Sequence, residues 1–339
     1  MVGYAKLWIM NGTRTFENSI GSLNELPKKQ INFIKDEIIE INYNDNFVTT
    51  KSEDISFDFL IISMGAVLAP EKIPGLVENG FNLYDHNQLD EIHHKLDKIE
   101  SGKIAIVIMA MPYKCPPAPF EASLLVDSML RKRGIRDSIQ IDFYSPAPIT
   151  LPAAGPEVSK KILDLVNSEK ITFHNSKKII RVEPKKLIFE NDEYSFDILL
   201  AIPPHTAPKV IYDSNLAKEP GFIPINRDCK TPHENIFAVG DVTSLVVTDS
   251  MAVPKAGIFA EGEGIAVAKN IVSKLLSKEP SVLFDGKGGC FLESGRDTAS
   301  IIEVDMFADP KPSTRLTEST KDNLSKKLDF EKERLSKWL

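Results

Sequence analysis

The sequence contains little cysteine and no long hydrophobic run. Its 3 cysteines among 339 residues are too few for the disulfide frameworks of small secreted domains. No apolar stretch reaches the roughly 18 residues that a membrane-spanning helix needs, and the first residues do not resemble a signal peptide. These absences favour a cytoplasmic, reducing compartment, in which a pair of cysteines is more often redox-active than structural.

Positively charged side chains are also fewer than negatively charged ones. Lys and Arg total 41 against 48 Asp and Glu, which gives a net charge of −7. Because a nucleic-acid binder needs a basic face, we expect no nucleic-acid partner. The 6 histidines show no metal-ligand spacing, so no metal site is expected. The length predicts two domains, and the hydrophobic fraction of 42% is ordinary for a folded protein.

Apolar strands alternate with helices along the chain, which is typical of α/β proteins with parallel sheets. The clearest unit is a strand over residues 103–111, a loop over 112–119 and a helix over 120–133 that ends before Gly134. Further strands are predicted at residues 29–41, 57–63, 139–144, 196–202 and 235–239, and further helices at 89–99, 156–168, 255–276 and 321–339.

A strand that ends in Gly240 and Asp241 is the first candidate site. Ligands of α/β folds bind at the carboxyl ends of strands, where a glycine permits close backbone approach. The Asp241 carboxylate can accept a hydrogen bond from a polyol hydroxyl. An ordinary strand-ending turn explains the dipeptide equally well.

The run IFAVGD, followed by PKAGIFAEGEG, resembles the flavoprotein disulfide reductases of the pyridine nucleotide-disulfide oxidoreductase superfamily. The resemblance implies that FAD is the cofactor and that Asp241 binds its ribitol chain. Gly240 and Val242 would lie against the cofactor, and Lys255 would lie close to the isoalloxazine ring. A helix N-terminus together with Lys255 would favour the anionic, reduced flavin. The run FDFLIISMG resembles another family strand and adds Gly65 as a cofactor-binding residue.

The unit at residues 103–133 contains no glycine, although reductases of this superfamily carry a Gly-x-Gly-x-x-Gly loop there. Without glycines the backbone cannot approach the pyrophosphate of NAD(P)H, so we expect another electron donor. Cys115 lies in this loop just before the helix, where the helix dipole is expected to lower the pKa of its thiol. A buried structural cysteine is the alternative. Glu121 is either a proton relay near Cys115 or a helix-surface carboxylate.

The run KCPPAPFE resembles sulfide:quinone oxidoreductases and the flavoprotein of flavocytochrome c sulfide dehydrogenase. The resemblance implies that Cys115 and Cys290, which lies in the run GGCFLESG, form a redox pair beside FAD. It also implies an enzyme that oxidises sulfide and passes electrons through FAD to a quinone. Such a pair requires a fold that brings the two Cα atoms within about 7 Å. Cys229 matches no redox position and is interpreted as structural.

The resemblance implies two Rossmann-like domains and a C-terminal region. The FAD domain would comprise residues 1–74 and 207–278, the NAD-like domain residues 75–206, and the C-terminal region residues 279–339. Family members begin with a strand and a Gly-x-Gly-x-x-Gly turn that binds the ADP half of FAD, and residues 1–22 resemble the segment that comes after that turn. We therefore expect an N-terminally incomplete FAD domain, in a fragment of a longer protein.

Two other functions stay open. An NAD(P)H-dependent FAD reductase of the type II NADH dehydrogenase kind is disfavoured by the glycine-free loop. A catalytically inactive relative, acting as a binding or assembly protein, would also lack the ADP-binding turn.

The terminal helix presents a stripe of apolar residues, which are Leu324, Leu328, Leu335, Trp338 and Leu339. This stripe fits either packing on its own domain or peripheral contact with the cytoplasmic membrane, and the family resemblance favours the membrane. A homo-oligomer is compatible with the sequence.

Overall fold

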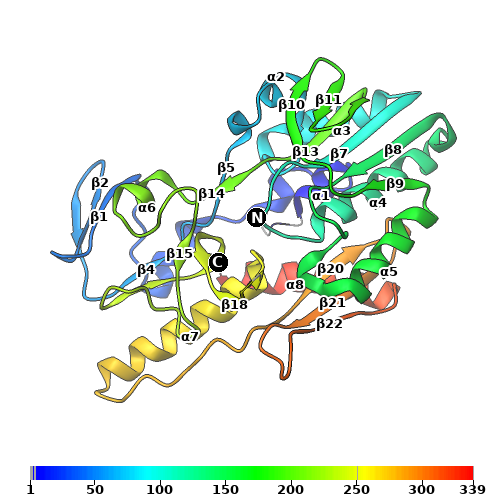
Figure 1. Ribbon diagram of the computed structural model, residues 1–339. Coiled ribbons are helices and arrows are strands. Elements are labelled where there is room, and N and C mark those ends of the chain that lie inside the picture. The colour runs from blue at the N-terminus through cyan, green and yellow to red at the C-terminus, as the bar shows by residue number, and fades with distance from the viewer. Residues whose placement is uncertain (1–2, 4, 250, 339) are drawn as a thin grey trace.

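A parallel sheet of five strands forms the centre of one half of the molecule in the computed structural model, which describes residues 3, 5–249 and 251–338 (Figure 1). All neighbouring strands in this sheet run parallel. The central strands are apolar and almost completely buried, because a parallel sheet is covered on both faces. Their spatial order is β6 (Phe81–Asn82), β13 (Ile198–Ile202), β7 (Gly102–Ile108), β8 (Ile139–Tyr144) and β9 (Ile171–His174).

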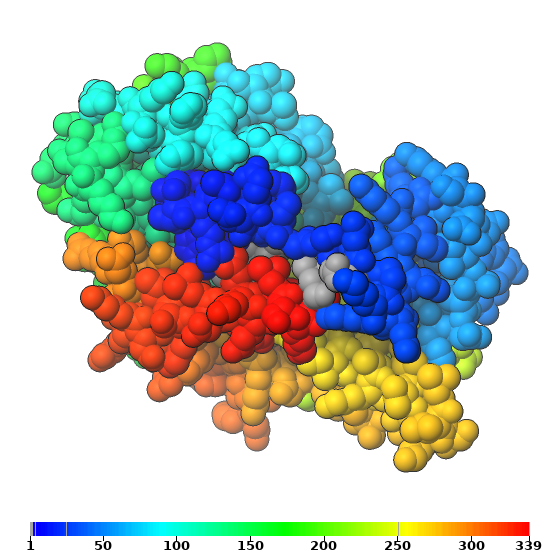
Figure 2. All heavy atoms as spheres, turned by 180° about the vertical axis from the view of Figure 1, so that it is seen from behind, coloured from blue at the N-terminus to red at the C-terminus, as the bar shows by residue number. Residues whose placement is uncertain are grey.

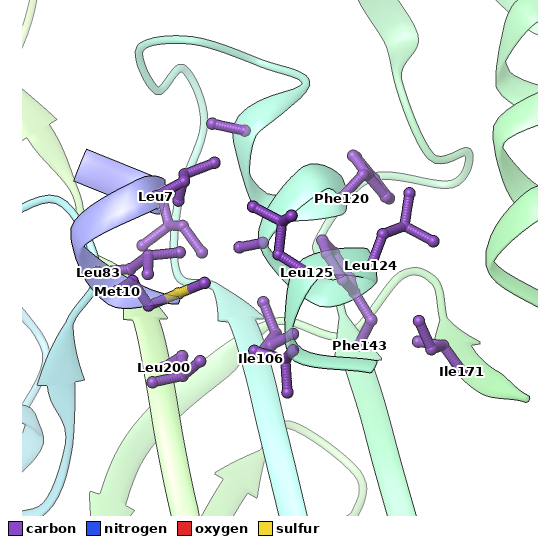
Figure 3. Packing of buried hydrophobic residues seen from close by; sticks show 14 of the residues in the cluster. Leu7, Met10, Leu83, Ile106, Phe120, Leu124, Leu125, Phe143, Ile171 and Leu200 are labelled. Carbon is purple, nitrogen blue, oxygen red and sulfur yellow. The ribbon is translucent and has the colours of Figure 1, made fainter. Parts of the chain in front are cut away.

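Helices cover one face of this sheet. Their apolar residues form one core with the strands, in which Leu7, Phe120, Leu124 and Phe143 are fully buried (Figure 3). An antiparallel sheet and a short helix lie against the other face. The covering elements are α1 (Ala5–Met10), α3 (Leu89–Lys98), α4 (Ala118–Lys132) and α5 (Gly155–Ser168) on the first face, and α2 (Leu76–Asn79), β10 (Ile179–Glu183), β11 (Lys186–Phe189) and β12 (Glu193–Ser195) on the second.

A second core surrounds a pair of parallel strands, β4 (Leu60–Ile62) and β16 (Ile236–Ala238), and the long helix α7 (Gly257–Leu275). An antiparallel pair of short strands, β5 (Val67–Leu68) and β14 (His205–Thr206), lies between the two halves. The remaining elements here are β1 (Ile38–Asn42), β2 (Phe47–Thr50), β3 (Asp54–Ser56), α6 (Lys209–Asp213), β15 (Ile223–Pro224), η7 (Gly240–Val242), β17 (Thr243–Ser244), β18 (Val246–Thr248) and β19 (Met251–Ala252).

The C-terminal region joins both halves. It is an antiparallel sheet of β20 (Lys287–Glu293), β21 (Ala299–Asp305) and β22 (Ser313–Leu316), followed by α8 (Lys321–Trp338). Residues 5–37 before β1 are called the N-terminal segment. Seen from behind, α8 lies beside this segment (Figure 2). The buried face of α8 is polar and consists of Asn323, Lys327 and Glu331, whereas Leu328 and Trp338 are exposed. The predicted apolar stripe is divided, because Leu324 and Leu335 are half-buried, while Leu339 lies outside the described residues.

The predicted alternation of strands and helices is confirmed, but some boundaries differ. The strand predicted over residues 29–41 is limited to Ile38–Asn42, and a 3₁₀ helix at Leu23–Lys29 precedes it. Residues 31–34 find no partner strand, so Ile31 and Ile34 remain exposed. Helix α4 begins at Ala118, earlier than predicted, because prolines are tolerated in a first helical turn.

Candidate functional site

A cavity of about 350 Å³ lies where the starts of α4 and α7 meet β20, α1 and α8. The fold brings five of the predicted site residues to its wall, namely Cys115, Glu121, Asp241, Lys255 and Cys290. Gly240 and Val242 lie on either side of Asp241 in the η7 turn. Gly65 follows β4 with φ of +67° but does not line this cavity.

The loop between β7 and α4 is fixed by its backbone at Cys115. The Cys115 N–H donates to the Lys255 carbonyl oxygen at 2.7 Å, which ties this loop to the segment before α7. The Cys115 carbonyl oxygen accepts from the Ala118 N–H at 2.9 Å and from the Tyr84 hydroxyl at 3.3 Å. Cys115 itself has φ of +52°, which is rare for a residue with a side chain. Backbone contacts thus place its side chain at the cavity wall.

The predicted low pKa of Cys115 is wrong. Burial raises the pKa of the thiol well above its usual range, and the neighbouring Cys290 and Glu121 raise it further. The Ala118 N–H at the start of α4 lowers the pKa of this thiol, but by less than burial raises it. Desolvation therefore decides the protonation state, and the thiol is neutral near pH 7.

Cys290 comes from β20, where it pairs with Ile302 of β21. Burial raises the pKa of its thiol to about 12, and the charge of Glu121 contributes. Both thiols are free in this structure, and they are close enough to influence each other electrostatically. Cys229 lies elsewhere, buried against α7, where its thiol donates to the Glu263 carbonyl oxygen at 3.9 Å.

Glu121 is not a surface carboxylate. It is 2% exposed, its Oε1 accepts from Lys327 Nζ at 2.6 Å, and its Oε2 accepts from the Glu293 N–H at 3.1 Å. Lys327 Nζ also donates to Glu293 Oε2 at 2.8 Å, as does the Trp8 indole N–H at 2.9 Å. Burial raises the pKa of Glu121, and the ammonium of Lys327 opposes this shift. Glu121 thus connects α4 with β20 and α8, beside both cysteines.

Sequence reasoning missed the partners Trp8, Glu293 and Lys327. The one available signal was the spacing of Asn323, Lys327 and Glu331, which places three polar residues on one face of α8. A polar helix face ordinarily indicates solvent, so this signal pointed away from burial.

A second charged cluster surrounds Asp241. Lys255 Nζ donates to the carbonyl oxygens of Asp241 at 2.7 Å and Thr243 at 3.0 Å, and it lies 3.3 Å from the centre of the Phe222 ring. Burial lowers the pKa of Lys255 to about 8 and raises the pKa of the Asp241 carboxyl. Sequence reasoning missed Glu263, whose Oε2 accepts from the Gly240 N–H at 2.6 Å.

The N-terminus of α7 faces this cavity, because Ala256, Gly257 and Ile258 line it. The first N–H groups of a helix have no intrahelical partner and favour negative charge. Together, the Asp241 carboxylate, the Lys255 ammonium and the start of α7 suit a ligand that carries both hydroxyl groups and an electron-rich ring. This donor set fits the ribityl chain and ring of FAD.

Known proteins resemble this chain in sequence and in fold. The family model described as pyridine nucleotide-disulphide oxidoreductase matches residues 140–266. The mitochondrial sulfide:quinone oxidoreductase of Dictyostelium discoideum is 27% identical over 74% of this chain and 59% of its own length. The sulfide-quinone reductase of Aquifex aeolicus is 28% identical over 88% of this chain and 73% of its own length. A type II NADH:quinone oxidoreductase of Staphylococcus aureus is 20% identical over 83% of this chain and 75% of its own length.

The structural comparison extends over almost the whole chain. The X-ray structure of the sulfide:quinone oxidoreductase from Aquifex aeolicus matches with a TM-score of 0.90 and 26% identity, and the match covers 99% of this chain and 82% of that one. The chain spans 59% of the length of the Dictyostelium relative. The chain is therefore similar, in sequence and in its Rossmann-like α/β fold, to the pyridine nucleotide-disulphide oxidoreductases and to sulfide:quinone oxidoreductases.

Proposed function

We propose that this protein oxidises sulfide with the cysteines Cys115 and Cys290 and passes the electrons through FAD to a quinone. One observation carries the proposal: the two cysteines, from a loop and a strand far apart in sequence, line the same cavity as Asp241 and Lys255. The sulfide:quinone oxidoreductases among the relatives support the same donor and acceptor.

The proposed cofactor site uses residues from η7 and the start of α7. Asp241 would accept hydrogen bonds from the ribityl hydroxyls, with the backbone at Gly65, Gly240 and Val242 close to the cofactor. Lys255 and the helix N-terminus would favour negative charge on the ring. Bound FAD would supply a two-electron carrier between thiol chemistry and the quinone.

The proposed cysteine chemistry is thiol–disulfide exchange. Hydrosulfide attacks a Cys115–Cys290 disulfide, one S–S bond breaks, one cysteine becomes a persulfide, and the other leaves as a thiolate. Because burial raises the pKa of both thiols, each thiolate is a poor leaving group unless it is protonated as it departs. Glu121 influences both thiols electrostatically, and we assign it the role of exchanging that proton.

The proposed access for quinone is the side of the cavity where Phe330 and Trp338 of α8 contribute to the wall. Leu328 of α8 is exposed, and Lys29 Nζ donates to the Lys337 carbonyl oxygen at 2.8 Å, so the N-terminal segment adjoins the end of α8. That segment exposes Ile31, Phe33 and Ile34. We define these three residues with Leu328 and Trp338 as the apolar face, and propose that it contacts the surface of the cytoplasmic membrane. No helix in the described part of the chain is long and apolar enough to cross a membrane.

The test is sulfide-driven reduction of a soluble quinone by the FAD-loaded chain under anaerobic conditions. We expect Cys115→Ser and Cys290→Ser to abolish turnover, because each removes one sulfur of the pair. Cys229→Ser is the matched control, since that thiol is buried but lies outside the cavity. Retained turnover in Cys115→Ser would refute the proposal.

A second candidate donor is NADH, which the Staphylococcus aureus relatives favour. Against it, the β7–α4 loop lacks glycine and places the bulky, buried Tyr113 and the Cys115 side chain where a pyrophosphate would need free backbone. Stopped-flow bleaching of the flavin by sulfide but not by NADH is expected. The opposite result would favour the NADH function, and a protein that takes up no FAD would favour an inactive binding role.

A further inference from the structure

Glu263 is a buried carboxylate that the proposed chemistry does not use. It lies in the second turn of α7, is 2% exposed, and directs Oε2 at the Gly240 N–H, 2.6 Å away. The nearest ammonium, that of Lys255, is bonded to the carbonyl oxygens of Asp241 and Thr243. A buried carboxylate must be compensated by hydrogen bonds, and the Gly240 N–H supplies one for Glu263. We therefore interpret Glu263 as a residue that fixes this N–H and the turn to which it belongs.

The turn that Glu263 contacts carries Asp241. Gly240 has φ of +77°, and a Cβ atom built on it would lie 3.1 Å from Cβ of Ala260, so the turn already lies tightly against α7. Between Gly240, Lys255 and Glu263 only about 10 Å³ of space remains, enough for one water molecule. A displacement of the Glu263 carboxylate would therefore move the turn and change the position of Asp241.

Three titratable groups face Glu263. They are Asp241 from η7, Lys255 from the segment before α7, and the Cys229 thiol from the loop after β15. Burial raises the pKa of Glu263 to about 7, the Gly240 N–H and Lys255 oppose this shift, and Asp241 adds to it. Glu263 therefore gains or loses a proton near neutral pH. A hydrogen bond to an ionised carboxylate is about twice as strong as one to a neutral acceptor, so the turn is fixed more firmly when Glu263 is ionised.

We propose that Glu263 is a positioning residue for FAD, which fixes the Gly240–Asp241 turn through the Gly240 N–H and makes the affinity for FAD depend on pH. The inference rests on the FAD site of the proposed function. It predicts tighter FAD binding as the pH rises from about 6 to about 7.5, because ionisation strengthens the bond that holds the turn.

The test is a fluorescence titration of the deflavinated chain of residues 1–339 with FAD across this pH range. In Glu263→Ala the Gly240 N–H loses its acceptor, and we expect affinity to fall about tenfold to a hundredfold at the upper pH. Glu263→Gln keeps a neutral acceptor, so it should restore most of the affinity while removing the pH dependence. Lys269→Gln, an exposed change on the same helix, is the control and should behave as wild type.

A second readout uses the protein without FAD. The pKa of Glu263 is about 7 in the folded chain against 4.5 for the free group, so its contribution to stability is lost as pH rises from about 4.5 to about 7. Glu263→Gln should remove this part of the pH profile of unfolding. Equal FAD affinity and equal pH profiles in wild type and both Glu263 variants would overturn the inference alone. A wild-type chain that binds no FAD would overturn the proposed function with it.

Discussion

Lys327 has no exposed surface, although it lies on a helix near the C-terminus. Its ammonium bonds Glu121 at 2.6 Å and Glu293 at 2.8 Å, and it lies 4.8 Å from the centre of the Trp8 ring. A buried ammonium is tolerated only where carboxylates compensate its lost hydration. The bond between Lys327 and Glu121 also connects α8 to α4, and Glu121 lies beside the cysteines.

Replacing Lys327 by Met should lower the free energy of unfolding by about 3–5 kcal/mol, because two buried carboxylates lose this ammonium. The neighbouring Lys326, whose ion pair with Asp322 is exposed, provides the control: Lys326→Met should cost less than about 1 kcal/mol. Urea denaturation followed by circular dichroism measures both. Equal stability of the two variants would show that the buried cluster contributes nothing.

His205 is a second buried titratable residue and gives a pH prediction. Burial lowers its pKa to about 4, and the charges of Lys114 and Lys255 add to this effect. Because the unfolded pKa is 6.5, the stabilisation is complete above pH 6.5 and is lost as pH falls toward 4, at a total on the order of 3 kcal/mol. In His205→Phe this loss should be absent from the unfolding profile. The exposed His94, changed to Phe, should keep it.

At the scale of elements, the connection into the five-stranded sheet depends on one glycine. Gly75 precedes α2 with φ of +76°, and a Cβ atom built on it would lie 2.0 Å from the Val182 carbonyl oxygen. The Val182 N–H donates to the Pro74 carbonyl oxygen at 2.9 Å, so the segment is attached to β10 at this point. Pro74 and Gly75 thus fix the chain against β10 before it enters the sheet.

Gly75→Ala should therefore destabilise the protein by more than about 2 kcal/mol, since it adds a steric clash to an unfavourable φ. Gly134→Ala separates the two causes, because Gly134 has φ of +72° but nothing within 4 Å of a built Cβ atom. That control should cost about 1 kcal/mol. Thermal unfolding of both variants checks the difference, and equal losses would exclude the clash.

At the scale of the whole molecule, the N-terminal segment and α8 together form the apolar face. Leu328 and Phe33 are 41% and 40% exposed, and the two segments meet where Lys29 bonds the Lys337 carbonyl oxygen. Figure 2 shows the two segments side by side on one side of the molecule. Exposed apolar side chains from two segments on one surface are typical of contact with another apolar phase.

Phosphatidylcholine vesicles should bind the wild-type chain, and the double variant Leu328→Ser with Phe33→Ser should bind about tenfold or more weakly, since it removes two large apolar contacts. Val272→Ser with Leu275→Ser is the matched control, because these residues of α7 are also apolar and are even more exposed. Co-sedimentation measures the bound fraction. Equal loss in both double variants would contradict a specific apolar face.

The sequence by itself determined the α/β class and the positions of most strands and helices, because these follow from local patterns that do not depend on distant parts of the chain. Cys115, Asp241, Lys255 and Cys290 were candidates from a family resemblance, and their roles stay predictions. It identified Leu328 and Trp338 as apolar residues of α8 but left open which side of the helix packs on the domain.

Only the tertiary structure decided the electrostatics of the site. Cys115 precedes a helix, yet burial by residues far away in sequence raises the pKa of its thiol instead of lowering it. The burial of Lys327 and the bond between Glu263 and the Gly240 N–H are likewise contacts between distant segments. Desolvation depends on which groups surround an atom in space, and no pattern along the chain carries that information.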